Sequence, residues 1–135
     1  MHKVLLVHAF SCWFMTGVIW LVQKLVYPFF RLIGKDEFKN CHQFHTRQIT
    51  WIVAPVMTIE LITGIWLLHQ SFNQIFLWNL FSIVCLWVLT ATVNVPAHNN
   101  LKYDSEISKK NLVYRNWFRT LIWSVRSLFL IWILW

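Results

Sequence analysis

The sequence predicts an all-α integral membrane protein: a bundle of four transmembrane helices with both termini on the extracytoplasmic side. Its 135 residues are 58% hydrophobic with a mean hydropathy of +0.52, far above the usual range for a soluble domain. Four apolar runs each reach the about 20 residues that span a hydrocarbon core. Little chain remains outside these runs, so residues 1–135 should form a single transmembrane domain.

The predicted helices cover about residues 4–33, 45–69, 75–95 and 112–135. The second helix contains Pro55, which lacks the N–H donor and so leaves a carbonyl free near mid-membrane. It also contains Gly64, and the first helix contains Gly17. Small residues let helix backbones approach closely in membranes, so both glycines are expected at helix contacts or local bends.

The distribution of cations predicts the orientation of the bundle. Two connections, after the first and the third helix, carry Arg31, Lys35, Lys39, Arg47, Lys102, Lys109, Lys110 and Arg115. The opposite side has only Lys3, so the positive-inside rule places both basic connections in the cytoplasm. These cations also attract the anionic headgroups of the lipid bilayer. Nucleic acid is not expected as a partner, because the cations are split between two loops without a recognisable nucleic-acid module.

One of the 5 acidic residues, Glu60, lies inside the second apolar run. At about 1.5 Å of rise per residue, it lies roughly 13 Å from the outer end of its helix, and Arg126 lies at about the same depth on the fourth helix. An ionised carboxylate alone in hydrocarbon costs several kcal/mol. We therefore expect Glu60 to face Arg126. The pair is either structural, fixing the helix register, or part of a mechanism.

Polar residues form a stripe along each of two helices. The stripe on the first helix consists of His8, Cys12, Thr16, Gln23 and Tyr27. The stripe on the fourth helix consists of Asn116, Arg119, Trp123 and Arg126. Each covers a sector of about 100° and should line the interior, where a polar seam suits a cofactor or a small amphipathic ligand. Arg119, together with Glu60 and Arg126, is therefore a candidate catalytic residue.

Three histidines are predicted at the cytoplasmic end. His42 and His45 stand at i and i+3 and share a helix face if the helix extends that far, and His98 follows the third helix on the same side. Imidazole binds zinc, copper and iron, so the three are candidate ligands of a transition metal. The alternative is that histidines at headgroup level simply hydrogen-bond water or lipid phosphate.

Two segments carry a resemblance to a known family. "VHAFSCWFMTGVIWLVQKLVYP" has a histidine nine residues before a glycine, and "PVMTIELITGIWLL" has a proline nine residues before Gly64 with "WLL" closing the helix. They resemble the first two helices of the small bacterial membrane protoporphyrinogen oxidases. "VPAHNNL" and "NWFRT" are similar to the four-helix family of anthrone-oxygenase-like proteins. The first resemblance implies an inner-membrane protein that binds haem b and oxidises a porphyrinogen, with His8 at the position of the first-helix histidine.

Two classes of function remain open. The first is a redox protein that acts on an amphipathic small molecule, with haem b or a metal between the helices and with His8 and His69 as ligands at the outer level. The second is a non-enzymatic accessory subunit or small carrier, in which Glu60 and Arg126 bind substrate or relay protons. The sequence also leaves open whether the chain forms a homo-oligomer.

Overall fold

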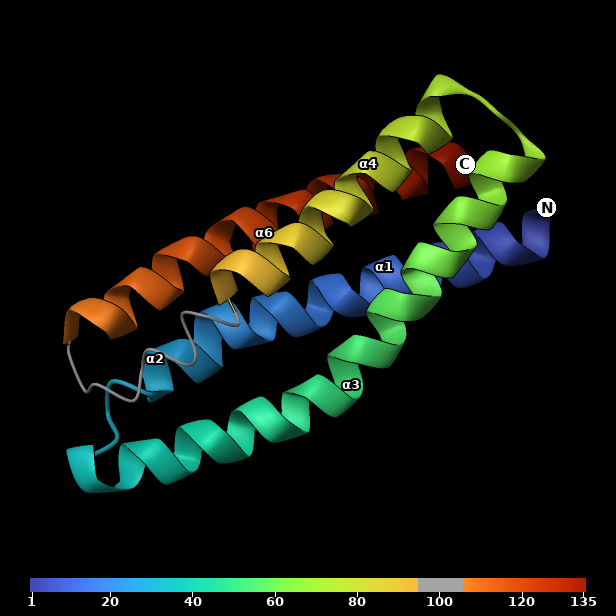
Figure 1. The fold of residues 1–135 in the computed structure, drawn as a ribbon. Helices are drawn as coiled ribbons and strands as arrows, with labels where there is room; N and C mark the ends of the chain where they lie inside the picture. The colour runs from blue at the N-terminus through green and yellow to red at the C-terminus, as the bar shows by residue number, and fades with distance from the viewer. Residues whose placement is uncertain (95–105) are drawn as a thin grey trace.

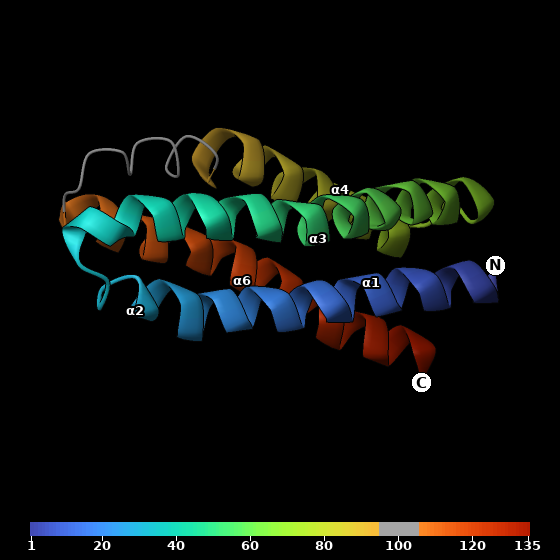
Figure 2. The same cartoon turned by 90° about the horizontal axis from the view of Figure 1, so that it is seen from below.

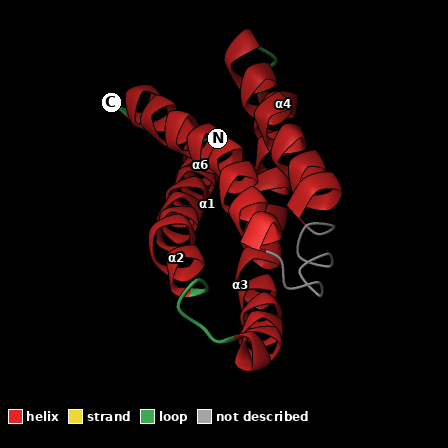
Figure 3. Cartoon of the chain, turned by 90° about the vertical axis from the view of Figure 1, so that its left-hand side faces the viewer, coloured by secondary structure: helices red, strands yellow, loops and turns green. Residues whose placement is uncertain are grey.

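The structure, a computed structural model, describes residues 1–94 and 106–135, and the elements in this part of the chain are all helices (Figure 3). The first continuous helical segment consists of α1 (His2–Leu21), the π-helix η1 (Val22–Val26) and α2 (Tyr27–Phe29). It is followed by α3 (Lys35–Gln70), α4 (Gln74–Leu89), the π-helix η2 (Thr90–Asn94) and α6 (Glu106–Leu134). Four of the described helical segments are long and apolar enough to cross a membrane. The predicted all-helical architecture is therefore confirmed.

The long helices form a bundle in the ring order α1, α3, α4, α6 (Figures 1 and 2). α1 packs against α3 and α6, and α4 packs against the same two helices from the other side. Both chain ends lie at one end of the bundle together with the α3–α4 turn, which we call the terminal end (Figure 1). The connection from α2 to α3 lies at the opposite end, which we call the loop end.

α3 begins at Lys35, well before the predicted start near residue 45. Asp36 and Glu37 occupy its first turn, where carboxylates interact favourably with the positive end of the helix dipole. No proline lies between Lys35 and Pro55. The segment predicted as a long basic connection is therefore mostly helix. α3 then bends about midway along its length (Figure 1), as expected for a helix with an internal proline.

The π-helix η1 keeps the polar stripe of the first helical segment directed toward the interior of the bundle. In an α-helix, residues four apart are rotated by about 40° relative to each other, so a long series at this spacing drifts around the helix. In η1 the Tyr27 N–H donates to the Val22 carbonyl, five residues earlier, which widens the turn. Pro28 has no N–H to contribute to the α-helical pattern. As a result Gln23 and Tyr27 are both 3% exposed, and the predicted inward stripe is confirmed.

The two glycines behave differently. Gly64 lies where α3 meets its neighbours, because a Cβ added there would lie 2.8 Å from Ile83 Cδ1 and 3.5 Å from His8 Cε1. Gly17 is exposed, with nothing within 4 Å of such a Cβ. The expectation that Gly17 mediates packing is therefore wrong. Gly17 follows the inward-facing Thr16 by one residue, and a rotation of about 100° turns it outward.

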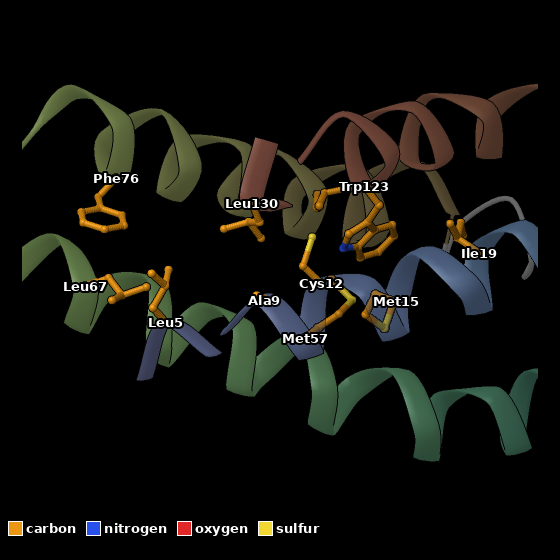
Figure 4. Packing of buried hydrophobic residues seen from close by; sticks show 11 residues of the cluster. Leu5, Ala9, Cys12, Met15, Ile19, Met57, Leu67, Phe76, Trp123 and Leu130 are labelled. Atoms are coloured by element: carbon orange, nitrogen blue, oxygen red, sulfur yellow. The ribbon is translucent and has the colours of Figure 1, made fainter. Parts of the chain in front are cut away.

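The interior combines an apolar core with the polar stripes. Cys12 and Met15 of α1, Met57 of α3 and Trp123 of α6 converge near the middle of the bundle (Figure 4). The outer surface is apolar as well, with large exposed side chains that include Trp51, Phe72, Trp78, Phe81, Leu128 and Trp132. Contiguous apolar surface on this scale indicates that lipid, and not water, surrounds the bundle.

The position of the termini leads to a topology prediction. A reporter fused after Trp135 should report the extracytoplasmic side, and one inserted at Ser105 should report the cytoplasm, because eight of the twelve Lys and Arg residues lie in the two predicted basic connections. Paired alkaline phosphatase and green fluorescent protein fusions measure this directly. The opposite pattern at both positions would reverse the orientation while leaving the bundle unchanged.

Candidate functional site

Glu60 and Arg126 form an ion pair in the interior of the bundle. Arg126 Nη1 donates to Glu60 Oε1 at 2.5 Å, and the two side chains are 6% and 1% exposed. Trp123 Nε1 donates to the other carboxylate oxygen, Oε2, at 3.2 Å. The pairing predicted from depth along the two helices is confirmed. Because both carboxylate oxygens have an N–H donor, the charge of Glu60 is compensated within the bundle.

His8 and Asn79 complete this arrangement on the side of α1 and α4. Asn79 Oδ1 accepts from Arg126 Nε at 3.3 Å and from Nη2 at 3.2 Å, which directs its Nδ2 donor to His8 Nε2 at 2.9 Å. His8 Nε2 therefore accepts, and the ring proton lies on Nδ1, which donates to Thr63 Oγ1 at 2.7 Å. Thr63 in turn donates to the Ile59 carbonyl at 2.7 Å.

We call His8, Glu60, Thr63, Asn79, Trp123 and Arg126 the charge cluster. It takes side chains from all four long helices, and each member forms at least one hydrogen bond with another member. His8 lies deeper than expected, at the level of the ion pair. Its Nε2 atom lies 3.5 Å from Arg126 Nη2, and Asn79 contacts both side chains.

The structure separates the two histidines proposed as haem ligands. His8 is fully buried and both its ring nitrogens already form hydrogen bonds, whereas His69 is exposed in the last turn of α3. The close approach of Ile83 to Gly64 leaves little room beside His8. The described residues therefore do not fit a haem held between His8 and His69 in this arrangement. Haem ligation by this pair stays a prediction from the sequence.

His42 and His45 lie on α3 near the loop end and both contact Phe30. Their ring centroids are 5.7 and 5.4 Å from that of Phe30. His98, the third candidate metal ligand, lies outside the described residues. Within residues 1–94 and 106–135, no three His, Cys, Asp or Glu side chains are grouped as a metal site. Metal binding by His42, His45 and His98 therefore also stays a prediction.

A cavity of about 230 Å³ lies between the four helices on the loop side of the charge cluster. Its apolar wall consists of Met15, Val18, Ile19, Val22, Ile49, Val53, Ala54 and Met57. Its polar wall consists of Tyr27, His45, Thr46, Thr50, Trp87, Thr90, Asn116 and Arg119. Three of the lining residues belong to irregular parts of the helices. Val22 lies in η1, Thr90 lies in η2, and Ala54 precedes Pro55 in α3. Such π-helical turns are frequent at functional sites.

Arg119 is the charged group on the cavity wall. Its side chain is 8% exposed, and no carboxylate pairs with it in the part of the chain that the structure describes. Nη1 makes a long hydrogen bond of 3.4 Å to Asn116 Oδ1, and Nε has no hydrogen-bond partner. The guanidinium carbon lies 5.2 Å from the centre of the Trp123 ring, within the range of a cation–π interaction. Arg119 is thus positioned by Asn116 and Trp123 but not neutralised.

Sequence reasoning found Glu60, Arg126, Arg119 and both polar stripes, but it missed Asn79, Thr63 and Trp87. Asn79 carried a usable signal, because it is an amide inside the apolar segment "LWNLFS". Trp87 carried none among 10 tryptophans, since only the fold shows that its indole N–H is buried without a partner and that the side chain lines the cavity. Of the three predicted catalytic residues, Glu60 and Arg126 thus belong to the charge cluster, and Arg119 lines the cavity.

These two features, the compensated charge cluster and the cavity with an uncompensated arginine, are the ones on which a functional assignment depends. No protein-family model matches the chain, and neither does any curated protein or solved structure.

Proposed function

We propose that this protein is a polytopic membrane protein that binds an amphipathic small molecule in the cavity on the loop side of the bundle, as a small carrier or an accessory subunit. The observation that carries the proposal is Arg119, a buried guanidinium that no carboxylate of the described residues pairs with, on the wall of an otherwise largely apolar cavity. Charged residues inside membrane bundles face a partner, a cavity or a pathway, because hydrocarbon does not solvate them.

The charge cluster supports a structural role for Glu60 and Arg126. Every polar group of the ion pair is directed to another side chain of the cluster, and neither residue lines the cavity. A proton relay or a substrate contact needs a group that faces solvent or ligand. Of the two interpretations of this pair, the one in which it fixes the register of α3 against α6 therefore has the stronger support.

The chemistry of the cavity supports an amphipathic ligand. α1 and α3 supply methyl and thioether groups to its wall, and Trp87 of α4 and Arg119 of α6 supply N–H donors. Pockets for drug-sized ligands measure about 300 to 1,000 Å³, so a cavity of about 230 Å³ suits a single chain or a small ring system better than a macrocycle.

Filling the cavity tests the proposal. Val53→Phe adds bulk on the cavity wall, whereas Val125→Phe makes the same change on an exposed, lipid-facing position of α6. In nanodiscs of neutral lipid, diazirine derivatives of palmitate and of hexadecanol should label cavity residues of the wild type. Val53→Phe should reduce this labelling at least about tenfold, as expected for a steric loss of 1.4 kcal/mol or more, and Val125→Phe should not.

Peptide mass spectrometry locates the labelled residues. If both probes label only exposed positions such as Leu128 and Trp132, and Val53→Phe changes nothing, the cavity does not bind such molecules and the proposed function fails.

A further inference from the structure

We propose that the ligand of this cavity carries an anionic head, a carboxylate or a phosphate, which binds the guanidinium of Arg119. This inference rests on the proposed function and specifies the chemical class of the ligand. The amphiphile would place its head at Arg119 and its apolar part against the apolar lining residues of α1 and α3.

Two arginines on the same face of α6 differ in their partners. Arg119 and Arg126 are about two helical turns apart, and both are almost completely buried. Arg126 has a carboxylate at 2.5 Å and an amide oxygen at 3.2 Å. Among the described residues, Arg119 has one long hydrogen bond, to Asn116, and the cation–π contact with Trp123. An arginine stays charged inside proteins, and a buried charge is normally paired. The missing partner of Arg119 is therefore an anion that the described part of the chain does not supply.

Residues that line the cavity also carry buried hydrogen-bond donors without partners in the described part of the chain. In the described part of the chain, two buried side-chain nitrogens lack a hydrogen-bond partner, Arg119 Nε and Trp87 Nε1, and both belong to residues that line this cavity. Buried donors are normally satisfied, and leaving one unmade costs about 1 to 3 kcal/mol. Two such donors around one cavity indicate a ligand rich in acceptor atoms.

Four other polar residues on the wall already form hydrogen bonds within the bundle. The hydroxyl groups of Thr46, Thr50 and Thr90 each donate to a carbonyl of their own helix, at 2.7 to 2.9 Å. Asn116 donates to Gln23 Oε1 at 2.8 Å, and Gln23 donates to the Val113 carbonyl at 3.2 Å. This chain of amides fixes Asn116 behind the guanidinium. A cationic head would face Arg119, which excludes it by charge repulsion.

The experiment compares head groups on one chain length. Palmitate, hexadecyl phosphate and hexadecanol compete against the hexadecanol diazirine probe for labelling of the cavity in neutral nanodiscs, and the dissociation constant of each is measured. Both anions should bind at least about tenfold more tightly than the alcohol, the ratio expected for one added charge-assisted hydrogen bond. A preference between palmitate and hexadecyl phosphate distinguishes a free carboxylate from a lipid-type phosphate as the source.

Two variants assign the effect to Arg119. Arg119→Met should bring the three dissociation constants within about threefold of one another, and Arg119→Lys should keep most of the preference because it keeps the charge. The matched control is Lys24→Met, which removes a cation from an exposed position beside Trp117, 5.4 Å away, and should leave the ratio unchanged.

The outcomes separate the two proposals. Equal binding of the three head groups by the wild type, with Arg119→Met without effect, would overturn the anionic ligand while the cavity still binds amphiphiles. A preference lost in Lys24→Met and kept in Arg119→Met would place the anion site at the membrane surface and overturn the inference. Absence of cavity labelling by any probe would overturn the proposed function itself.

Discussion

Replacing Arg126 by methionine should lower the free energy of unfolding by about 3 to 5 kcal/mol, because Glu60 is left as an uncompensated buried charge. Glu60→Gln should have a loss of the same order for the converse reason. The double variant, Glu60→Gln with Arg126→Met, should recover much of the loss if the pair is only structural. Unfolding in SDS, followed by tryptophan fluorescence, gives the four free energies of the double-mutant cycle.

Arg119→Met is the matched control for this cycle. It removes the same side chain from the same face of α6, but from a position without a carboxylate partner among the described residues. Its stability in the absence of ligand should be unchanged or higher, since no opposite charge is orphaned. Additive losses of Glu60→Gln and Arg126→Met, with no coupling energy, would contradict the contact that underlies the charge cluster.

Replacing Gly64 by alanine should destabilise the bundle by about 1 to 3 kcal/mol, the usual cost of overpacking a core. The added Cβ would lie 2.8 Å from Ile83 Cδ1, a side chain that is itself 1% exposed and so has little room to move. Because His8 Cε1 lies at 3.5 Å from the same Cβ, displacement of α1 would also disturb the charge cluster. The measurement is again unfolding in SDS.

Gly17→Ala makes the same chemical change where no atom lies within 4 Å of the new Cβ. It should be neutral, or stabilising by about 0.5 to 1 kcal/mol from the higher helix propensity of alanine. Equal effects of the two substitutions would mean that Gly64 does not lie in a tight contact between α3 and its neighbours.

The sequence predicted the helices and their inward faces because both depend on periodicity and hydropathy, which are local properties of the chain. It also predicted the meeting of Glu60 with Arg126, since the depth of a residue in a membrane follows from counting along a helix. The prediction was less accurate where a local preference was weak. The start of α3 is one example, because polar residues after Gly34 are compatible with either a loop or a helix.

The site itself depended on more than depth. His8 and His69 were expected at one level, yet His8 lies beside the ion pair, enclosed by Thr63 and Asn79, and His69 is exposed in the last turn of α3. Level fixes the distance along the bundle axis but not the rotation of each helix or its tilt, and these decide which side chains meet.

By itself, therefore, the sequence predicted a bundle of four helices that are long and apolar enough to span a membrane, with an acidic and a basic residue at matching depth. Only the tertiary structure decided that Arg126 is neutralised by a carboxylate, whereas no carboxylate of the described residues pairs with Arg119. The two residues look equivalent on one helical face, and the difference arises because α3 brings Glu60 beside Arg126, whereas no carboxylate of the described residues lies beside Arg119. Charge compensation is a property of neighbours in space, and spacing along a single helix does not contain it.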